Sequence, residues 1–340
     1  MNLFDYEGLA QARLHPAVWD YIAAGSDDEI TLAENRQAFA RVTLRPRVLV
    51  DVSRIDTATS ILGDPVSAPI LIAPAGMHAA ACPEGECAAA RAADRAGVAM
   101  MASTNSNRTI EEIAAAANGP LWLQLYLFAE RSRTLALVRR AEDAGCRAIV
   151  LTVDAPRWGR KERSLRSEAQ FDWPAAANLK GLPPTSVDHP YGGAPATWAD
   201  LDWLRTITRL PILLKGILTP EDAAIAAGRG VEGIVVSNHG GRQLDGVAAA
   251  IDALPEVAAA AEGRCEIYLD SGVRRGTDVL KALALGARAV MIGRPILWGL
   301  AVAGADGAFD VLAMLQRELA WAMALSGRPT IASIDRSLVS

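Results

Sequence analysis

Cysteine is scarce in this chain of 340 residues, and its few copies form no pattern. The four cysteines, Cys82, Cys87, Cys146 and Cys265, are scattered along the sequence. The one close pair has no second pair or histidine cluster to complete a zinc site, so we expect no metal centre. Free thiols or small buried side chains are the simpler interpretation, and such usage is typical of a reducing compartment.

Strong charge and long apolar segments are also missing. The net charge is -5, and no basic stripe with interleaved aromatic residues is present, so we expect no nucleic-acid partner. The acidic N-terminal residues lack the apolar core of a signal peptide, and the last three residues are not a peroxisomal signal. No apolar run approaches the ~20 residues that span a bilayer. We therefore expect a cytoplasmic protein without membrane contact.

Short apolar runs are what the sequence does contain, at regular intervals from residue 69 onward. Apolar residues make up 51% of the chain, enough for a large core. The runs are continuous rather than alternating, as expected for parallel strands that are covered on both faces. We identify eight of them: 69–73, 98–102, 121–125, 148–152, 212–215, 233–237, 266–270 and 289–293.

Helical signals separate these runs. Pro83 opens a helix near residue 84, Thr109 and Glu112 form a capping box, and Thr219 is an N-cap followed by Pro220. Eight strand–helix units predict an α/β fold, a closed (β/α)8 TIM barrel, because doubly wound sheets usually stop at five or six strands. A chain of this length fits one such domain, residues 1–340.

Two segments depart from this rhythm. Residues 1–65 predict two or three helices, roughly 4–13, 16–24 and 28–40, which would pack on the barrel as a lid or floor. Residues 160–197, after the fourth strand, are rich in proline and glycine and show no clear periodicity. A long irregular connection in a compact barrel is usually an active-site loop.

Polar residues follow every predicted strand, at the end where barrel enzymes place their active sites. The seventh and eighth loops carry Asp270, Gly272, Arg274, Gly293 and Arg294. Glycines let the backbone approach a phosphate, and arginine clamps it in a bidentate manner. These loops predict a phosphorylated ligand; turn glycines with surface arginines are the alternative.

Lys215 ends the fifth run, directly after three apolar residues. A cation at the end of a buried strand is costly unless it meets a negative partner. Three explanations stay open from the residues alone. The lysine could form a Schiff base as in an aldolase, face an electron-rich ring that becomes anionic, or pair with a carboxylate in the core.

His239 is one of four histidines, and it follows the sixth run with Arg242 three residues later. Imidazole titrates near neutrality and suits proton abstraction, and a guanidinium fits a carboxylate. The pair predicts a base beside an anchored carboxylic acid. Asp154 could lie across the barrel and pair with His239; capping of the turn before Pro156 is the alternative.

These segments resemble one family nearly from end to end. It is the FMN-dependent 2-hydroxy acid dehydrogenases and oxidases, which include glycolate oxidase, lactate oxidase, mandelate dehydrogenase and the flavin domain of flavocytochrome b2. The segment 237–246 is highly specific for the family. The others are moderately so: 19–22, 32–36, 72–74, 83–86, 124–126, 151–154, 214–216, 272–278 and 292–295.

The resemblance implies an FMN site and a homo-oligomer, a tetramer in this family. Residues implied at the isoalloxazine ring are Ala75, Gly76, Ser103, Gln124, Thr152, Lys215 and Ser237. Lys215 would then sit where negative charge collects on reduction, which decides against the Schiff base. Residues implied at the ribityl chain and phosphate are Asp270, Gly272, Arg274, Gly293 and Arg294.

The resemblance also implies a substrate site. Tyr21 and Arg242 would hold the carboxylate of an (S)-2-hydroxy acid and Tyr126 its hydroxyl, while His239 with Asp154 removes a proton. Three positions depart from the family or from glycolate oxidase. Lys161 replaces a second arginine, with Arg160 and Arg163 nearby; Asn105 replaces a tryptophan, and Trp158 a small aliphatic residue.

Other enzymes with a phosphate-binding barrel are the alternatives to this family. An inosinate-dehydrogenase-like enzyme needs a cysteine after the sixth strand, and none lies there. An aldolase would also be a phosphate-binding barrel. A type 2 isopentenyl diphosphate isomerase would also bind FMN, but it gives no reason for the spacing of His239 and Arg242. A non-catalytic barrel would have eroded strand ends. Oxygen or another electron acceptor, hydride or carbanion transfer, and the identity of the hydroxy acid stay open.

Overall fold

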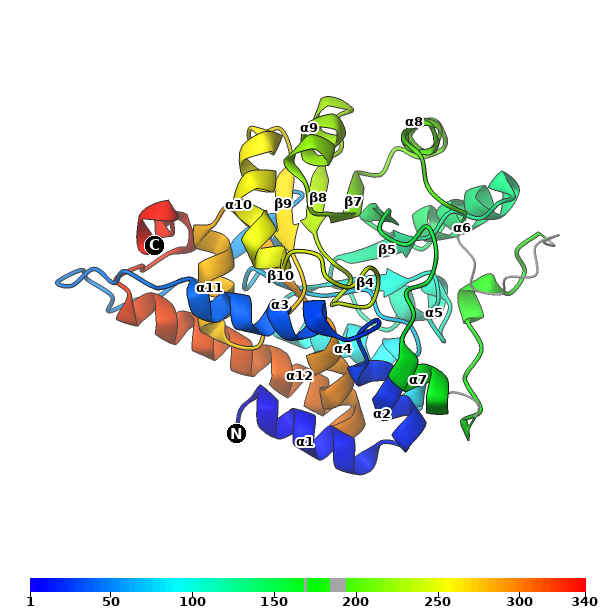
Figure 1. The fold of residues 1–340 in the computed structure, drawn as a ribbon, viewed down its shortest axis with the longest axis horizontal. Coiled ribbons are helices and arrows are strands. Elements are labelled where there is room, and N and C mark those ends of the chain that lie inside the picture. Colours follow the sequence, from blue (N-terminus) through cyan, green and yellow to red (C-terminus); the bar gives the residue numbers. More distant parts are fainter. Residues whose placement is uncertain (168–169, 184–193) are drawn as a thin grey trace.

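Eight parallel strands close into a barrel in the computed structural model, which describes residues 1–167, 170–183 and 194–340 (Figure 1). β10 pairs in parallel with β3, with Val290 opposite Ile70, and this closure confirms the predicted (β/α)8 architecture. The strands are β3 (Ile70–Ile72), β4 (Ala99–Ser103), β5 (Leu121–Leu125), β6 (Ala148–Thr152), β7 (Ile212–Ile217), β8 (Gly233–Val236), β9 (Glu266–Leu269) and β10 (Ala289–Ile292).

Alternate residues of these strands divide between two cores. Inward-pointing side chains such as Met101, Trp122 and Tyr268 form one cluster, and their neighbours pack under the surrounding helices. Burial on both faces explains why each strand is a continuous apolar run. The rings of Trp122 and Tyr268 meet edge-on at 5.5 Å, so the barrel interior is filled with side chains.

A short hairpin closes the barrel end opposite the active-site loops. β1 (Thr59–Ile61) and β2 (Asp64–Val66) pair antiparallel, and Ile61 and Val66 join the inner cluster of the barrel. The N–H of Leu62 donates to the Glu266 carboxylate at 3.0 Å. The sequence predicted only helices before residue 65, so this hairpin corrects that prediction.

The three N-terminal helices are confirmed as α1 (Leu3–Arg13), α2 (Pro16–Ala23) and α3 (Ile30–Arg41). α2 and α3 cover the C-terminal end of the barrel. Asn35 of α3 exchanges side-chain hydrogen bonds with Asn238, just after β8, at 2.8 and 2.7 Å. Of the two positions expected for these helices, lid or floor, α2 and α3 therefore occupy that of a lid.

The outer helices begin where the sequence placed them. Thr109 and Glu112 make the predicted capping box, and the Thr219 hydroxyl caps the helix that starts at Pro220. The helix expected near residue 84 begins at Glu86, two residues later. The helices are α4 (Glu86–Ala96), α5 (Ile110–Ala115), α6 (Arg131–Asp143), α8 (Trp198–Ile207), α9 (Pro220–Gly228), α10 (Ala250–Ala261), α11 (Gly276–Ala284) and α12 (Arg294–Leu325).

α12 has the length and apolar composition of a membrane-spanning helix, although Asp306 and Asp310 interrupt it in the sequence. Half of its most apolar stretch is buried in the protein, where it packs against α4 and α1. Ala303 and Gly304 leave helical backbone angles, so α12 is two pieces joined at a kink. Core helices of soluble proteins have the same composition.

The connection after β6 is less irregular than expected from its sequence. It contains α7 (Glu162–Ser167) and a 3-10 turn, η3 (Ala177–Leu179). α7 packs against α2, where the Ser167 hydroxyl donates to Asp20 at 2.8 Å. Residues 184–193 of the predicted active-site loop, with Pro184 and Pro190, lie outside the described residues.

Candidate active site

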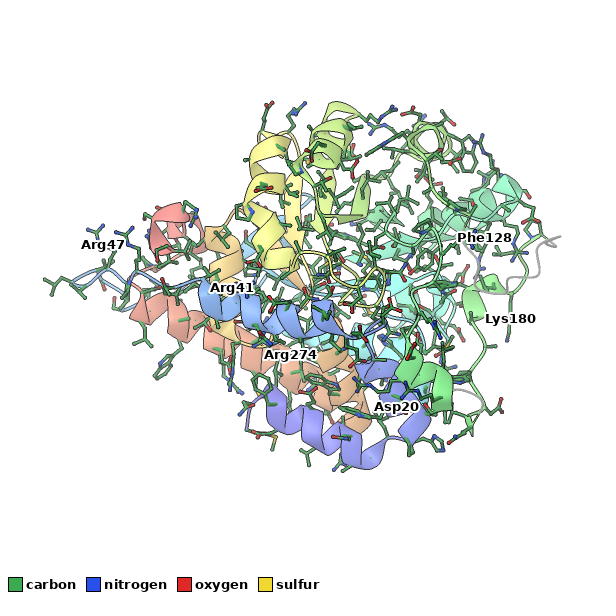
Figure 2. All side chains as sticks on the ribbon, viewed as in Figure 1. Asp20, Arg41, Arg47, Phe128, Lys180 and Arg274 are labelled. Atoms are coloured by element: carbon green, nitrogen blue, oxygen red, sulfur yellow. The ribbon has the colours of Figure 1, made fainter. Side chains whose placement is uncertain are left out.

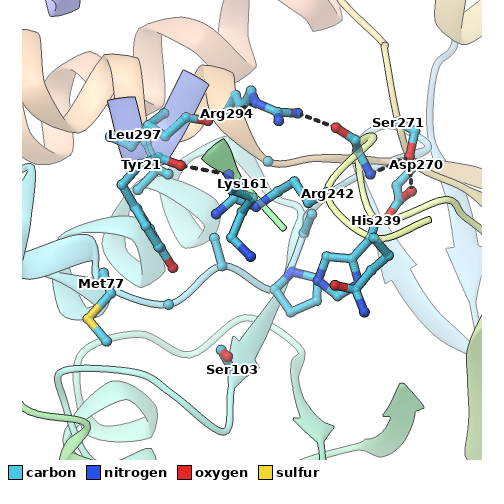
Figure 3. A pocket seen from close by; sticks show the side chains of 18 of the residues that line it. Tyr21, Met77, Ser103, Lys161, His239, Arg242, Asp270, Ser271, Arg294 and Leu297 are labelled. Carbon is cyan, nitrogen blue, oxygen red and sulfur yellow. Dashed lines mark hydrogen bonds between the residues drawn. The ribbon is translucent and has the colours of Figure 1, made fainter. Parts of the chain in front are cut away.

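A cavity of about 440 Å3 opens at the C-terminal ends of the barrel strands (Figure 3). Most of the residues singled out from the sequence line it, and they come from all parts of the chain. They are Tyr21, Ala75, Gly76, Ser103, Asn105, Tyr126, Trp158, Lys161, Lys215, His239, Arg242, Asp270, Gly272, Arg274, Gly293 and Arg294. Gln124, Asp154 and Ser237 are not lining residues, but each forms a hydrogen bond to one of them, and Thr152 forms a hydrogen bond to Gln124.

His239 and Asp154 form a pair at the centre of the site. Nδ1 of His239 lies 3.0 Å from one Asp154 carboxylate oxygen and 3.2 Å from the other. Burial would raise the pKa of Asp154, but the charge and hydrogen bond of His239, with help from Lys215, lower it. The ionised carboxylate accepts the hydrogen bond from Nδ1, which orients the ring and leaves Nε2 on the side of Tyr126 and the cavity.

The backbone at His239 is strained. His239 has a φ of 60°, and Gly240 and Gly241 follow with φ of 67° and 72°. A left-handed conformation at a histidine costs free energy, and such residues cluster at functional sites. This turn places the imidazole over the cavity while the N–H of His239 donates to the Ser237 hydroxyl at 3.0 Å.

Tyr126 contributes a protonated hydroxyl beside the base. Its oxygen lies 3.5 Å from Nε2 of His239. Burial, and then the Asp154 charge, raise the pKa of Tyr126 above its ordinary value, so the hydroxyl keeps its proton at neutral pH. A substrate hydroxyl placed between these two groups meets one donor and one acceptor.

Lys215 is fully charged and paired. Its Nζ lies 3.1 Å from an Asp270 oxygen and donates to the Ser237 hydroxyl at 2.9 Å. Burial would lower the pKa of Lys215, but Asp270 and Asp154 raise it above its usual value. Of the explanations left open by the sequence, pairing with a carboxylate is present, and the lysine also faces the cavity.

Arg242 and Tyr21 stand together on the other side of the base. The Arg242 guanidinium lies over the Tyr21 ring at 4.9 Å and donates to the Tyr21 carbonyl at 2.6 Å. Among the residues that the structure describes, no carboxylate lies within 4.0 Å of this guanidinium. A cation held in place by carbonyls can bind a carboxylate ligand.

Lys161 is the cation of the 160–163 segment that reaches the cavity. Its Nζ donates to the Gly159 carbonyl at 2.9 Å and lies 5.9 Å from the Trp158 ring centre. Arg160 pairs with Glu162 near the surface, and Arg163 pairs with Glu29. Of these three cations, Lys161 is therefore the one that lines the cavity.

Gln243 joins the loop after β6 to the loop after β8. Its amide nitrogen donates to the carbonyls of Asp154 at 2.9 Å and Arg157 at 3.0 Å, and its oxygen accepts the N–H of Gly159 at 2.9 Å. A side chain at Gly159 would collide with the carbonyl oxygen of Arg242. This joint sets the positions of Trp158 and Lys161 relative to Arg242.

A chain of side-chain amide and hydroxyl groups backs one part of the cavity. The Ser103 hydroxyl donates to the Gln124 carbonyl oxygen at 3.0 Å, and the Gln124 amide donates to the Thr152 hydroxyl at 3.0 Å. Gly76 faces it, and a Cβ there would lie 2.9 Å from the Asn105 carbonyl. The arrangement leaves room for a flat ring with polar edges.

The far end of the cavity carries buried guanidinium groups. Arg294 donates to the carbonyls of Ile22, Ala24 and Gly240. Burial and two nearby arginines lower the pKa of Arg294 well below its usual value, and burial with Arg36 lowers that of Arg274 to about 10. Within the described part of the chain, neither Arg274 nor Arg294 has a carboxylate partner. An anionic ligand group such as a phosphate would neutralise their buried charge.

Several lining residues were not singled out from the sequence. Leu165 and Trp173 follow no strand end directly, whereas the position of Ser271 directly after Asp270 in the seventh loop was a signal in the sequence. The Ser271 hydroxyl donates to Asp270 at 2.6 Å and accepts the Gly240 N–H at 3.0 Å. It links the seventh loop to the turn at His239.

Comparison with known proteins agrees with this geometry. The FMN-dependent dehydrogenase family matches residues 10–340, and the chain belongs to this family. It is therefore an FMN-dependent oxidoreductase, which sets aside an aldolase, an inosinate dehydrogenase and an isopentenyl diphosphate isomerase.

Individual relatives cover the whole chain. An L-lactate oxidase from a Nostoc species is 49% identical over 100% of this chain and 98% of its own length. A peroxisomal (S)-2-hydroxyacid oxidase of Arabidopsis thaliana is 50% identical over 100% of this chain and 96% of its own. A solved mandelate oxidase with (S)-2-phenylpropionate superimposes with a TM-score of 0.92 at 44% identity, covering 100% of this chain and 97% of that one.

The cavity fits FMN by the chemistry of its residues. Arg274 and Arg294 offer buried positive charge for a phosphate, and the glycines Gly272 and Gly293 bring backbone close to it. Lys215 brings a cation to the middle of the cavity, where a reduced flavin ring would carry negative charge. The polar chain from Ser103 to Thr152 borders the remaining space.

Proposed function

We propose that this protein oxidises an (S)-2-hydroxy acid to the 2-oxo acid. One observation carries the proposal: a base, His239 with Asp154 behind it, faces the same cavity as Arg242, a cation held by carbonyls. A 2-hydroxy acid needs both groups, one for its proton and one for its carboxylate. The relatives named as lactate, 2-hydroxyacid and mandelate oxidases support this assignment.

Each lining group has a role in this reaction. Arg242 and Tyr21 bind the carboxylate, with Lys161 as a second cation. Tyr126 and Nε2 of His239 hold the hydroxyl end, and His239 takes the proton while Asp154 stabilises the imidazolium. Bound FMN supplies the chemistry of accepting two electrons. Asn105 and Trp158 border the substrate side chain.

The cofactor contacts are assigned in the same way. Ala75, Gly76, Ser103, Gln124 and Thr152 surround the ring. Lys215, which donates to Ser237, would stabilise negative charge on the bound ring. Asp270, Gly272, Arg274, Gly293 and Arg294 would hold the ribityl chain and the phosphate. We further infer that oxygen is the electron acceptor, giving hydrogen peroxide, because the relatives are named oxidases.

The decisive experiment is anaerobic reduction of the yellow holoprotein by a panel of (S)-2-hydroxy acids, followed in the flavin absorbance. At least one acid should bleach the flavin in a saturable manner, and admission of air should restore the colour with one peroxide per turnover. Flavin that no 2-hydroxy acid reduces would contradict the proposal. Bleaching without reoxidation by air would keep the reaction and replace oxygen by another acceptor.

We also propose a homotetramer in the cytoplasm. The loop that carries Arg47 projects from the barrel (Figure 2), and its tip residues Val48 and Leu49 are 80% and 102% exposed. Leu325, 70% exposed, lies beside the contact of this loop with Ser326. Exposed apolar groups of this kind are typical of subunit contacts. Light scattering of the holoprotein distinguishes a tetramer from a monomer or dimer.

A further inference from the structure

The outer wall of the cavity, defined as Trp158, Leu165 and Trp173, is aromatic and apolar. All three residues belong to the connection that follows β6. The Trp158 ring meets the Tyr126 ring edge-on at 5.3 Å, and the Trp173 ring meets the Tyr21 ring at 5.0 Å. Each tryptophan ring therefore contacts the ring of a tyrosine assigned to the substrate.

The outer wall faces the one part of the substrate that the chemistry leaves unassigned. Under the proposed function, Arg242 takes the carboxylate, and His239 with Tyr126 takes the hydroxyl end. The substituent that remains on carbon 2 is the side chain. Its surroundings decide which 2-hydroxy acids are accepted, because the reacting groups are common to all of them.

Trp173 is held in place by the loop between β4 and α5. The Asn107 amide donates to the carbonyls of Pro174 and Ala175, both at 3.1 Å, and its oxygen accepts the N–H of Ala79 at 3.0 Å. Further along, the buried Asn178 donates to the Ser103 carbonyl at 3.0 Å. On its other side Trp173 packs edge-on against Phe171 at 5.0 Å. The indole thus contacts two rings, and the backbone that follows it is held by the side chains of two asparagines.

We propose that the outer wall selects 2-hydroxy acids with a bulky apolar or aromatic side chain, with Trp173 as the specificity-determining residue and Asn107 as its positioning residue. The inference rests on the proposed function. A phenyl or branched aliphatic group buries against the indole rings and Leu165, whereas the hydrogen of glycolate or the methyl of lactate leaves them uncovered. Ligand cavities lined in this way usually bind apolar groups.

The test is a comparison of kcat/KM for glycolate, (S)-lactate, (S)-2-hydroxy-4-methylpentanoate and (S)-3-phenyllactate with the holoprotein. 3-Phenyllactate should exceed lactate at least tenfold, and glycolate should be the poorest. Trp173→Ala should lower the ratio of 3-phenyllactate to lactate at least tenfold, mainly through KM. Trp321→Ala, at a 72% exposed tryptophan outside the cavity, should leave the ratio unchanged.

Asn107→Ala tests the positioning role separately. It should lower the same ratio at least threefold through KM, with kcat for lactate retained, because only the indole is displaced. 3-Phenylpropionate lacks the hydroxyl and cannot react. Its inhibition constant should rise in Asn107→Ala and in Trp173→Ala by about the same factor as KM for 3-phenyllactate. Trp173→Phe should restore part of the ratio lost in the alanine variant.

Each outcome separates the two proposals. Lactate or glycolate equal to 3-phenyllactate in the unmodified protein would overturn the selectivity and leave the oxidation of 2-hydroxy acids intact. Equal losses of kcat/KM for 3-phenyllactate and lactate in Trp173→Ala would show that Trp173 has only a structural role. This result would also overturn the proposed selectivity. Flavin reduction by none of the four acids would remove the proposed function itself.

Discussion

The two walls of the cavity are built by different means. The inner wall consists of strand ends and short loops that carry charged groups. They include two buried pairs, Lys215 with Asp270 and His239 with Asp154. The outer wall comes from one long connection, made of rings and fastened by neutral amides such as Asn107. Removing one partner of a buried ion pair leaves an unpaired buried charge, which lowers stability strongly. Exchanging a ring for a smaller side chain removes apolar contact area. The reaction and its selectivity are therefore carried by separate parts of the chain.

The largest expected effect lies at the base of the inner wall. His239→Gln should lower the rate constant of flavin reduction by about 10³-fold, because a general base typically contributes 10²–10⁴-fold. Stopped-flow reduction under anaerobic conditions measures this, and the flavin-to-protein ratio should be unchanged. Reduction within tenfold of the original rate would remove His239 as the base.

Lys215→Met should destabilise the holoprotein by roughly 3–5 kcal/mol, because Asp270 is left as a buried unpaired charge. The folded-state pKa of Lys215 is raised, so its stabilising contribution is complete below about pH 10.4, its unfolded value, and is lost as the pH rises through the folded value. Urea unfolding should show a constant difference between pH 6 and 9. A difference that disappears within this window would contradict the pairing.

Arg242 and Lys161 should contribute unequally to binding the carboxylate of the substrate. Arg242→Met should lower kcat/KM by about 10²-fold, within the range of 2–5 kcal/mol for truncating one partner of a buried charge pair. Lys161→Met should cost about tenfold, since an ammonium makes no bidentate contact and Lys161 stands near the outer wall. Lys161→Arg is the matched control and should keep or improve kcat/KM. Equal losses for Arg242→Met and Lys161→Met would make the lysine a full partner.

The smallest effect is expected away from both walls. Thr219→Ala removes the hydroxyl that caps α9 and should cost about 1 kcal/mol of unfolding free energy. It should not change kcat/KM for any substrate. Thr219→Ser, which keeps the capping oxygen, serves as the control in thermal unfolding. A change in substrate preference here would show that selectivity is not confined to the outer wall.

The inner wall was predictable from the sequence, and much of the outer wall was not. Strands buried on both faces are continuous apolar runs, so their ends, and with them Lys215, His239 and Asp270, could be located directly. Trp173 follows no strand. It reaches the cavity because Phe171 packs on His15 of the helix cap before α2, a contact between distant segments that no local pattern records.

Two elements were missed for local reasons. The β1–β2 hairpin has strands of three residues, and Pro65 within β2 argues against a strand in any sequence-based prediction. α7 is short and polar, and it is stabilised by contacts to α2 such as Ser167 with Asp20. Both elements owe their structure to tertiary packing more than to their own residues.

Gln243 has a consequence for any attempt to retarget this protein. Its side-chain amide forms hydrogen bonds with the backbone carbonyls of Asp154 and Arg157 and with the N–H of Gly159. The backbone of the residue that supports the base is therefore connected to the start of the outer wall. A loop transplanted from a relative has to bring a glycine at position 159 and carbonyls that this amide can reach. Without them the carboxylate behind His239 shifts together with the graft. Substitutions that retarget the protein should therefore be confined to the segment that carries Leu165 and Trp173. This segment lies beyond the residues that Gln243 contacts, so the Asp154 carboxylate should keep its position.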